Sequence, residues 1–166
     1  MPLGRDSWRR GLAERRGGSA DGRGSAELER FVAAQASVYP RVLAELRAGE
    51  KHGHWMWFIF PQIAGLGHSE MAQRYAIADL DEARAYLAHP LLGARLADCT
   101  DTMLGWAGRR SAEAILGPID ALKFCSSMTL FDAAGGGPRY VRVIESFCNA
   151  QRDGPTKDRL AALKGR

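Results

Sequence analysis

The sequence has no long hydrophobic run and no apolar segment at its N-terminus. Its longest unbroken apolar stretch is the six residues 55–60, in a chain of 166 residues. A membrane-spanning helix needs about 20 apolar residues, and a secretory signal needs an apolar segment of about 7–15 residues near the N-terminus. We therefore expect no membrane association, and the cytoplasm is the expected location.

Cysteine is also scarce. The three cysteines, Cys99, Cys125 and Cys148, are odd in number, widely spaced and without a CxxC pair. Each stands in an apolar, helix-like context. This pattern predicts buried free thiols in a reducing compartment, rather than disulfides or a zinc site.

Over most of the chain, neither positive nor negative charge is in clear excess. The net charge is +4, but residues 1–24 hold six arginines against three acidic residues and so carry +3 of it. Residues 25–166 are nearly neutral, which argues against a basic face for nucleic acid. The Gly- and Arg-rich residues 1–24 are expected to form a disordered leader, or to reflect a start codon placed too far upstream.

Alternation of apolar and polar residues, the mark of a half-buried strand, is absent as well. Apolar residues recur instead at helical spacing from Ser25 onward. Ser25, Ser69, Asp79, Ser111 and Asp120 are predicted helix caps, with Glu82 completing a capping box after Asp79. We predict a single compact all-α domain of about eight short helices over residues 25–166.

The most unusual segment that is present covers residues 52–62, HGHWMWFIFPQ. His52 and His54 share a face only in extended structure, where they could ligate a metal, but no third ligand is signalled. We therefore predict no metal site. His54 is the better candidate for contacting a substrate or phosphate, and a solvated or carbonyl-bound histidine is the plain alternative.

The aromatic run at residues 55–60 is either a helix or a buried strand, since periodicity does not decide between them. Trp55 and Trp57 are candidates for stacking on a planar ring, although tryptophans of a small helical domain usually belong to the core. Gln62 and the turn at residues 65–69, GLGHS, lead into a helix start that favours an anion. A tight turn with a helix cap explains that turn equally well.

The second candidate segment is KFCSSMTLF, residues 123–131. On a helix, Lys123 shares one face with Ser126 and Ser127. A lysine among hydroxyls at an apolar edge suits a base, a nucleophile or a cation that holds phosphate. A solvated lysine beside helical serines is the alternative. No cofactor motif is present.

Four blocks of the sequence resemble a family of short bacterial proteins of unknown function, many of which carry the label "calpastatin". The blocks lie between about residues 28 and 160 and read LERFVAAQASVY, HWMWFIFPQIAGLGHS, YAIADLDEARAYLAHPLLGARL and SSMTLF. The resemblance implies a mainly α-helical fold. The family usually has a basic residue where this chain has Cys125, and a more acidic loop than residues 117–120. The calpastatin label does not indicate calpain inhibition, because calpain inhibitors are disordered, repetitive and poor in tryptophan.

Fragments are also similar to the NADAR family of ADP-ribose-linked N-glycosidases, which are helical, rich in core tryptophan and carry a lysine-phenylalanine pair like Lys123-Phe124. In that family a lysine is thought to attack the ribose, so this likeness implies the same role for Lys123.

Two functions remain open from the sequence. The first is the binding, or hydrolysis, of a nucleotide-like or phosphorylated small molecule. Its site would use Lys123 as nucleophile or anion clamp, with His54, Trp55, Trp57, Gln62, Ser126 and Ser127. The second is a non-catalytic interaction module, either a homo-oligomer or an adaptor, whose interface is an exposed aromatic surface around residues 55–60.

Overall fold

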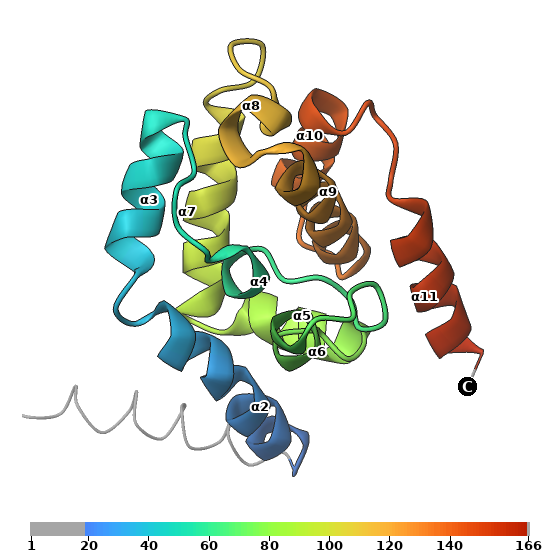
Figure 1. The fold of residues 1–166 in the computed structure, drawn as a ribbon. Coiled ribbons are helices and arrows are strands. Elements are labelled where there is room, and N and C mark those ends of the chain that lie inside the picture. Colours follow the sequence, from blue (N-terminus) through green and yellow to red (C-terminus); the bar gives the residue numbers. More distant parts are fainter. Residues whose placement is uncertain (1–18, 166) are drawn as a thin grey trace, which may run out of the picture.

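The computed structural model describes residues 19–165, and in that range the chain is a bundle of ten helices (Figure 1). The helices are α2 (Ser19–Gln35), α3 (Tyr39–Ala48), α4 (Met56–Ile59), α5 (Glu70–Arg74), α6 (Leu80–Ala88), α7 (Leu92–Leu104), α8 (Ala112–Leu116), α9 (Pro118–Ala133), α10 (Pro138–Phe147) and α11 (Gly154–Lys164). Within these residues the extended pairing is limited to an isolated parallel bridge between Ile63 and Ile77. The predicted all-α domain is confirmed. None of these helices is long and apolar enough to cross a membrane.

Three of the predicted helix caps are made. The side chains of Ser69, Asp79 and Ser111 each accept a hydrogen bond from the amide three residues further on. Such a cap satisfies one of the amides that the first turn of a helix leaves without a partner. Short-range sequence signals therefore determined where α5, α6 and α8 begin.

The predicted cap at Asp120 is wrong. Helix α9 begins at Pro118, three residues earlier than predicted, after Gly117 with a φ of 91°. Proline suits the first turn because its φ is already helical and its missing amide hydrogen is not needed there. Asp120 consequently lies in the first turn, and its carboxylate is free to bind side chains from elsewhere.

Helix α2 also begins earlier than predicted, at Ser19, so that Ser25 lies inside it. Gly22 and Gly24 lower the helix propensity of this stretch, which is why the sequence indicated a later start. The leader predicted over residues 1–24 falls mostly on residues 1–18, outside the described part of the chain.

The aromatic run at residues 55–60 is not a strand: its middle part, Met56–Ile59, forms α4 at the centre of the molecule, and Trp55 and Phe60 flank this short helix (Figure 1). Five of its six residues are at most 7% exposed, and only Trp57 is half-buried. The expected exposed aromatic surface around residues 55–60 is therefore wrong. Six large apolar side chains in succession gain more by entering the core than by remaining at a surface.

Helix α9 passes through the middle of the fold and packs against α6, α8, α10 and α11. Phe124, Met128 and Phe131 on its inner side are fully buried. The ring of Phe124 meets that of Phe60 edge to face, with their centroids 4.8 Å apart. Because its inner side is fixed in this way, α9 holds its outer residues rigidly at the surface.

Candidate functional site

A surface hollow of about 300 Å³ lies where the outer side of α9 faces the loop after α4 and the start of α11. It is lined by Gln62, Leu66, Gly67, Ile119, Leu122, Lys123, Ser126, Asp153 and Pro155. Three residues that the sequence singled out, Gln62, Lys123 and Ser126, thus come together in one place. Their side chains offer an ammonium group, an amide and a hydroxyl above an apolar floor.

Lys123 stands between an aromatic ring and a carboxylate. Its Nζ lies 5.5 Å from the centre of the Trp57 ring and 3.9 Å from Asp120 Oδ1, and its side chain is 30% exposed. Both neighbours attract a cation. The ammonium group is thereby held at the edge of the hollow, within reach of an anion.

Lys51 binds the same carboxylate from the other side. Its Nζ lies 2.9 Å from Asp120 Oδ2 and donates to the carbonyl of Gly53 at 2.6 Å. It also lies 5.0 Å from the Trp55 ring. This lysine, whose side chain is only 9% exposed, ties the loop before α4 to the first turn of α9. Two lysines share one aspartate, so these three side chains together carry a charge of +1, which the carboxylate of Asp153 in the lining of the same hollow balances.

Glu45 of α3 holds that loop in place. Its Oε1 accepts hydrogen bonds from the amides of His52 and Gly53 and from Trp55 Nε1, at 2.7, 2.9 and 3.0 Å. Burial alone would raise the pKa of Glu45, but the hydrogen bonds from Gly53, His52 and Trp55 outweigh it and lower the pKa. Hydrogen bonds to a buried carboxylate thus fix this loop, which forms neither helix nor strand.

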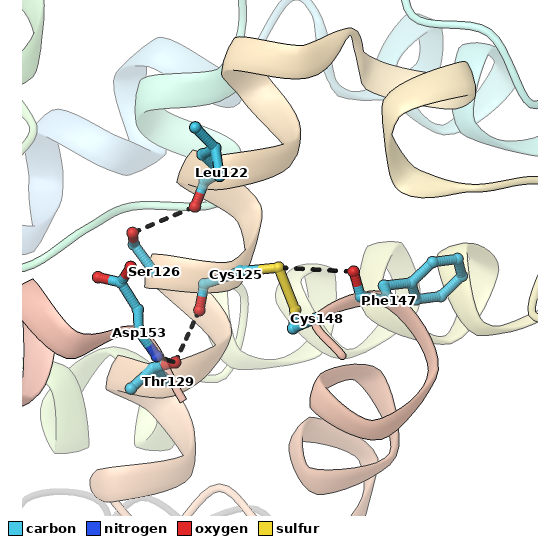
Figure 2. The surroundings of a disulfide bond; sticks show 7 residues. All are labelled: Leu122, Cys125, Ser126, Thr129, Phe147, Cys148 and Asp153. Atoms are coloured by element: carbon cyan, nitrogen blue, oxygen red, sulfur yellow. Dashed lines mark hydrogen bonds between the residues drawn. A yellow bond between two sulfur atoms is a disulfide. The ribbon is translucent and has the colours of Figure 1, made fainter. Parts of the chain in front are cut away.

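The two serines next to Lys123 face different ways. Ser126 lines the hollow, and its hydroxyl donates to the carbonyl of Leu122 at 3.1 Å. Figure 2 shows Ser126 and Asp153 on the same side of α9. Ser127 is fully buried, and its hydroxyl finds no hydrogen-bond partner among residues 19–165. Ser127 therefore faces the core and does not line the hollow.

The histidine and the tryptophans are also separated from one another. His54 is exposed and does not line the hollow. Trp55 is 2% exposed, with its indole nitrogen bound to Glu45, so it offers no free face for stacking. Trp57 is half-buried beside Lys123. Of the aromatic candidates, Trp57 is the one placed near the hollow.

The turn at residues 65–69 forms one wall. Leu66 and Gly67 line the hollow, and Arg159 Nε of α11 donates to the carbonyl of Ala64 at 3.0 Å. Gly65 has a φ of 99°, and a Cβ there would stand 2.6 Å from Arg159 Nε. Glycine is therefore required where α11 meets this turn.

Asp153 was not identified from the sequence. Its Oδ2 caps α11 by accepting from the amide and the hydroxyl of Thr156, at 3.1 and 2.6 Å. Its own amide donates to Thr129 Oγ1 of α9 at 2.9 Å. The stretch DGPT signals a helix start, but only the packing of α11 against α9 shows that Asp153 lines the hollow.

The prediction of three free thiols is wrong for two of them. Cys125 of α9 and Cys148 at the end of α10 form a disulfide (Figure 2). Cys99 is free and buried. Cysteines 23 residues apart meet because α10 folds back along α9. Spacing in the sequence carries no signal for that contact. No group of three or more histidine, cysteine or acidic side chains in residues 19–165 could hold a metal ion.

Comparison with known proteins gives a family and a fold. Residues 25–160 match the family described as "Protein of unknown function (DUF1810)". The structure is similar to the crystal structure of the conserved hypothetical protein Rv1873 from Mycobacterium tuberculosis, with a TM-score of 0.78 and 51% sequence identity. That match covers 81% of this chain and 96% of Rv1873.

No curated protein matches the sequence significantly. Neither the calpastatin label nor the likeness to NADAR proteins is supported by these matches. The predicted membership of a family of unknown function is confirmed: the chain belongs to the DUF1810 family.

Proposed function

We propose that the hollow on α9 binds a small anionic molecule, either nucleotide-like or phosphorylated. Lys123 contacts the anionic group, and Gln62 and Ser126 provide hydrogen bonds. Leu66 and Leu122 cover an apolar part of the ligand. A few polar groups set around apolar side chains are the usual composition of a small-molecule site.

One observation carries this proposal. Gln62 and Lys123 belong to separate segments that were each selected from the sequence for their chemistry, and both line the same hollow. The fold does not need Lys123 there, because Lys51 already binds Asp120 at 2.9 Å whereas Lys123 lies 3.9 Å away. A partly exposed pair at this distance contributes about 1 kcal/mol at most. Ligand binding would therefore explain the position of Lys123, which the stability of the fold does not explain.

A finer form of the proposal is an ADP-ribose-type N-glycosidase, in which Lys123 attacks the ribose. It rests on the likeness of Lys123-Phe124 to the NADAR pair. Its test is the release of the base from ADP-ribose-linked substrates, which Lys123→Ala should abolish.

The binding proposal is tested by thermal shift on the full chain against ADP-ribose, NAD, nucleotides and sugar phosphates. A ligand at 100 times its Kd stabilises the fold by about 2.7 kcal/mol. Lys123→Ala should remove that shift while the Tm of the free protein stays within a few degrees. Lys157→Ala, an exposed lysine of α11 that does not line the hollow, is the matched control and should keep the shift. Ligand binding that survives Lys123→Ala would refute the proposal.

A second function, a protein-interaction module, is favoured by a different feature. Ile119 and Leu122 on the outer side of α9 are 70% and 72% exposed. Neighbouring exposed apolar side chains are typical of contact surfaces. The interface would then be the outer side of α9 rather than the aromatic surface expected from the sequence. Through it the chain would self-associate or bind a protein partner.

Light scattering coupled to size-exclusion chromatography distinguishes the two functions. An oligomer that dissociates in Ile119→Asp or Leu122→Asp would support the module. A monomer that shows ligand-induced stabilisation lost in Lys123→Ala would support the small-molecule site.

A further inference from the structure

The connection between α10 and α11, residues 148–153, is held against α9 at both of its ends. At one end, Cys148 is bonded to Cys125 of α9. At the other end, the amide of Asp153 donates to Thr129 Oγ1, and this hydroxyl in turn donates to the carbonyl of Cys125 at 2.8 Å. Figure 2 shows the disulfide and Asp153 on different sides of α9, so the connection wraps around the helix.

The backbone between the two attachments adopts a disfavoured conformation. Asn149 and Ala150 both have a φ of 56°. Left-handed backbone is disfavoured for residues with a Cβ, and alanine has no side-chain hydrogen bond to compensate. Such a conformation persists where the surroundings impose it. The surroundings here are the two attachments to α9 and a third one, in which Arg152 Nε donates to Asp132 Oδ2 of α9 at 2.7 Å. They also include a backbone hydrogen bond from the Ala150 amide to the carbonyl of Ile144 in α10 at 3.0 Å.

The same connection carries one wall of the hollow. Asp153 and Pro155 line it opposite Lys123 and Ser126 of α9. The position of this wall relative to Lys123 depends on how tightly residues 148–153 are bound to α9.

We propose that the Cys125–Cys148 disulfide is a redox switch that sets the geometry of the hollow. A small or protein dithiol supplies two electrons and two protons: the S–S bond breaks, two S–H bonds form, and the dithiol becomes a disulfide. The attack falls on Cys125, the less buried of the two residues. Reduction frees Cys148 from α9, and the Asp153 wall, which stays joined to α9 through Arg152 and the Asp153 amide, loosens.

The switch rests on the proposed function only where it predicts ligand affinity. Its structural part stands separately, because the attachments of residues 148–153 exist whatever the hollow binds. Oxidised protein therefore has the formed site, and reduced protein has the loosened one. Cys99 takes no part, since it is buried and unpaired.

The test measures amide hydrogen exchange of the full chain, with and without a dithiol. Exchange at residues 150–156 should rise at least about tenfold on reduction, while the buried part of α9 stays protected. Cys125→Ser should show the fast exchange in both conditions. Cys99→Ala, which keeps the disulfide, should behave like the wild type. Alkylation of denatured, unreduced protein should reveal one thiol.

Three results would overturn the switch: three alkylated thiols in the unreduced chain, exchange at residues 150–156 that does not respond to the dithiol, or a Kd for ADP-ribose that is equal in both redox states. A larger Kd in reduced protein and in Cys125→Ser supports it. Redox-dependent exchange together with no binding by any compound tested supports the switch and instead refutes the proposed small-molecule function.

Discussion

At the scale of single residues, Glu45 shows how one buried side chain organises a site that it does not touch. Three donors from the loop before α4 converge on its Oε1. That loop contains Gly53, whose carbonyl binds Lys51, and Lys51 in turn binds Asp120 beside Lys123. The position of the proposed anion clamp is therefore linked to Glu45 through a chain of polar contacts.

Glu45→Gln should lower the free energy of unfolding by about 1–3 kcal/mol at pH 7, because hydrogen bonds to a charged acceptor become hydrogen bonds to a neutral one. The pKa of Glu45 is below its ordinary value of 4.5. Its stabilisation is therefore fully present above pH 4.5 and is lost as the pH falls through the folded pKa. Urea denaturation at several pH values should show the gap between wild type and variant closing in acid.

Glu50→Gln is the matched control, since the Glu50 side chain is 63% exposed and its contact with His52 Nε2, at 3.9 Å, is long. It should change stability by less than about 0.5 kcal/mol. A Glu45→Gln variant as stable as the wild type at pH 7 would show that the three hydrogen bonds do not hold the loop.

At the scale of elements, α9 combines two roles on opposite sides. Its inner residues are fully buried, while Ile119 and Leu122 remain exposed and Lys123 borders the hollow. The helix packs against α6, α8, α10 and α11, so its position is overdetermined. The connection between α10 and α11 is different, because it depends on a few attachments and on a left-handed backbone.

Ala150→Gly should raise the free energy of unfolding by about 0.5 kcal/mol or more, because glycine adopts a φ of 56° without the steric cost that alanine has. Thermal or urea denaturation measures the change. The same substitution at Ala161, inside α11, should instead destabilise by about 1 kcal/mol. An Ala150→Gly variant that is destabilised as much as Ala161→Gly would show that the strain at this position is absent.

At the scale of the whole molecule, the disulfide joins α9 and α10, two helices that already pack together. The third cysteine, Cys99, differs from the two disulfide-bonded cysteines because it is a free, buried thiol. Burial raises the pKa of the Cys99 thiol to about 12, and the nearby Asp98 carboxylate adds to this effect. Cys99 is therefore a protonated, unreactive thiol at neutral pH.

A thiol-reactive dye should accordingly find no reactive thiol in the native protein, one after denaturation, and three after denaturation with reduction. Reduction should lower the free energy of unfolding by about 2–4 kcal/mol, because the open chain gains conformational freedom when unfolded. Cys99→Ala should keep this difference, and Cys125→Ser should lose it. Rapid labelling of native, oxidised protein would contradict the burial of Cys99.

Much of the helical framework was predictable from the sequence. Ser69, Asp79 and Ser111 cap helices as predicted, because a cap is a contact between residues three apart and needs no tertiary structure. The start of α9 was misplaced because Asp120 has the chemistry of a cap, while the preceding Pro118 begins the helix. For the hollow, the sequence singled out Gln62, Lys123 and Ser126 but not Asp153.

What the sequence by itself determined is the helical class and the starts of α5, α6 and α8, all of which follow from local spacing and capping. Tertiary structure alone decided that Cys125 meets Cys148, that Lys51 shares Asp120 with Lys123, and that Ser127 faces inward while Ser126 faces the hollow. The physical reason is that these contacts join segments far apart in the chain, or depend on how one helix is rotated against its neighbours. A short stretch of sequence specifies neither which distant segment a residue will contact nor how its helix is rotated against the neighbouring helices.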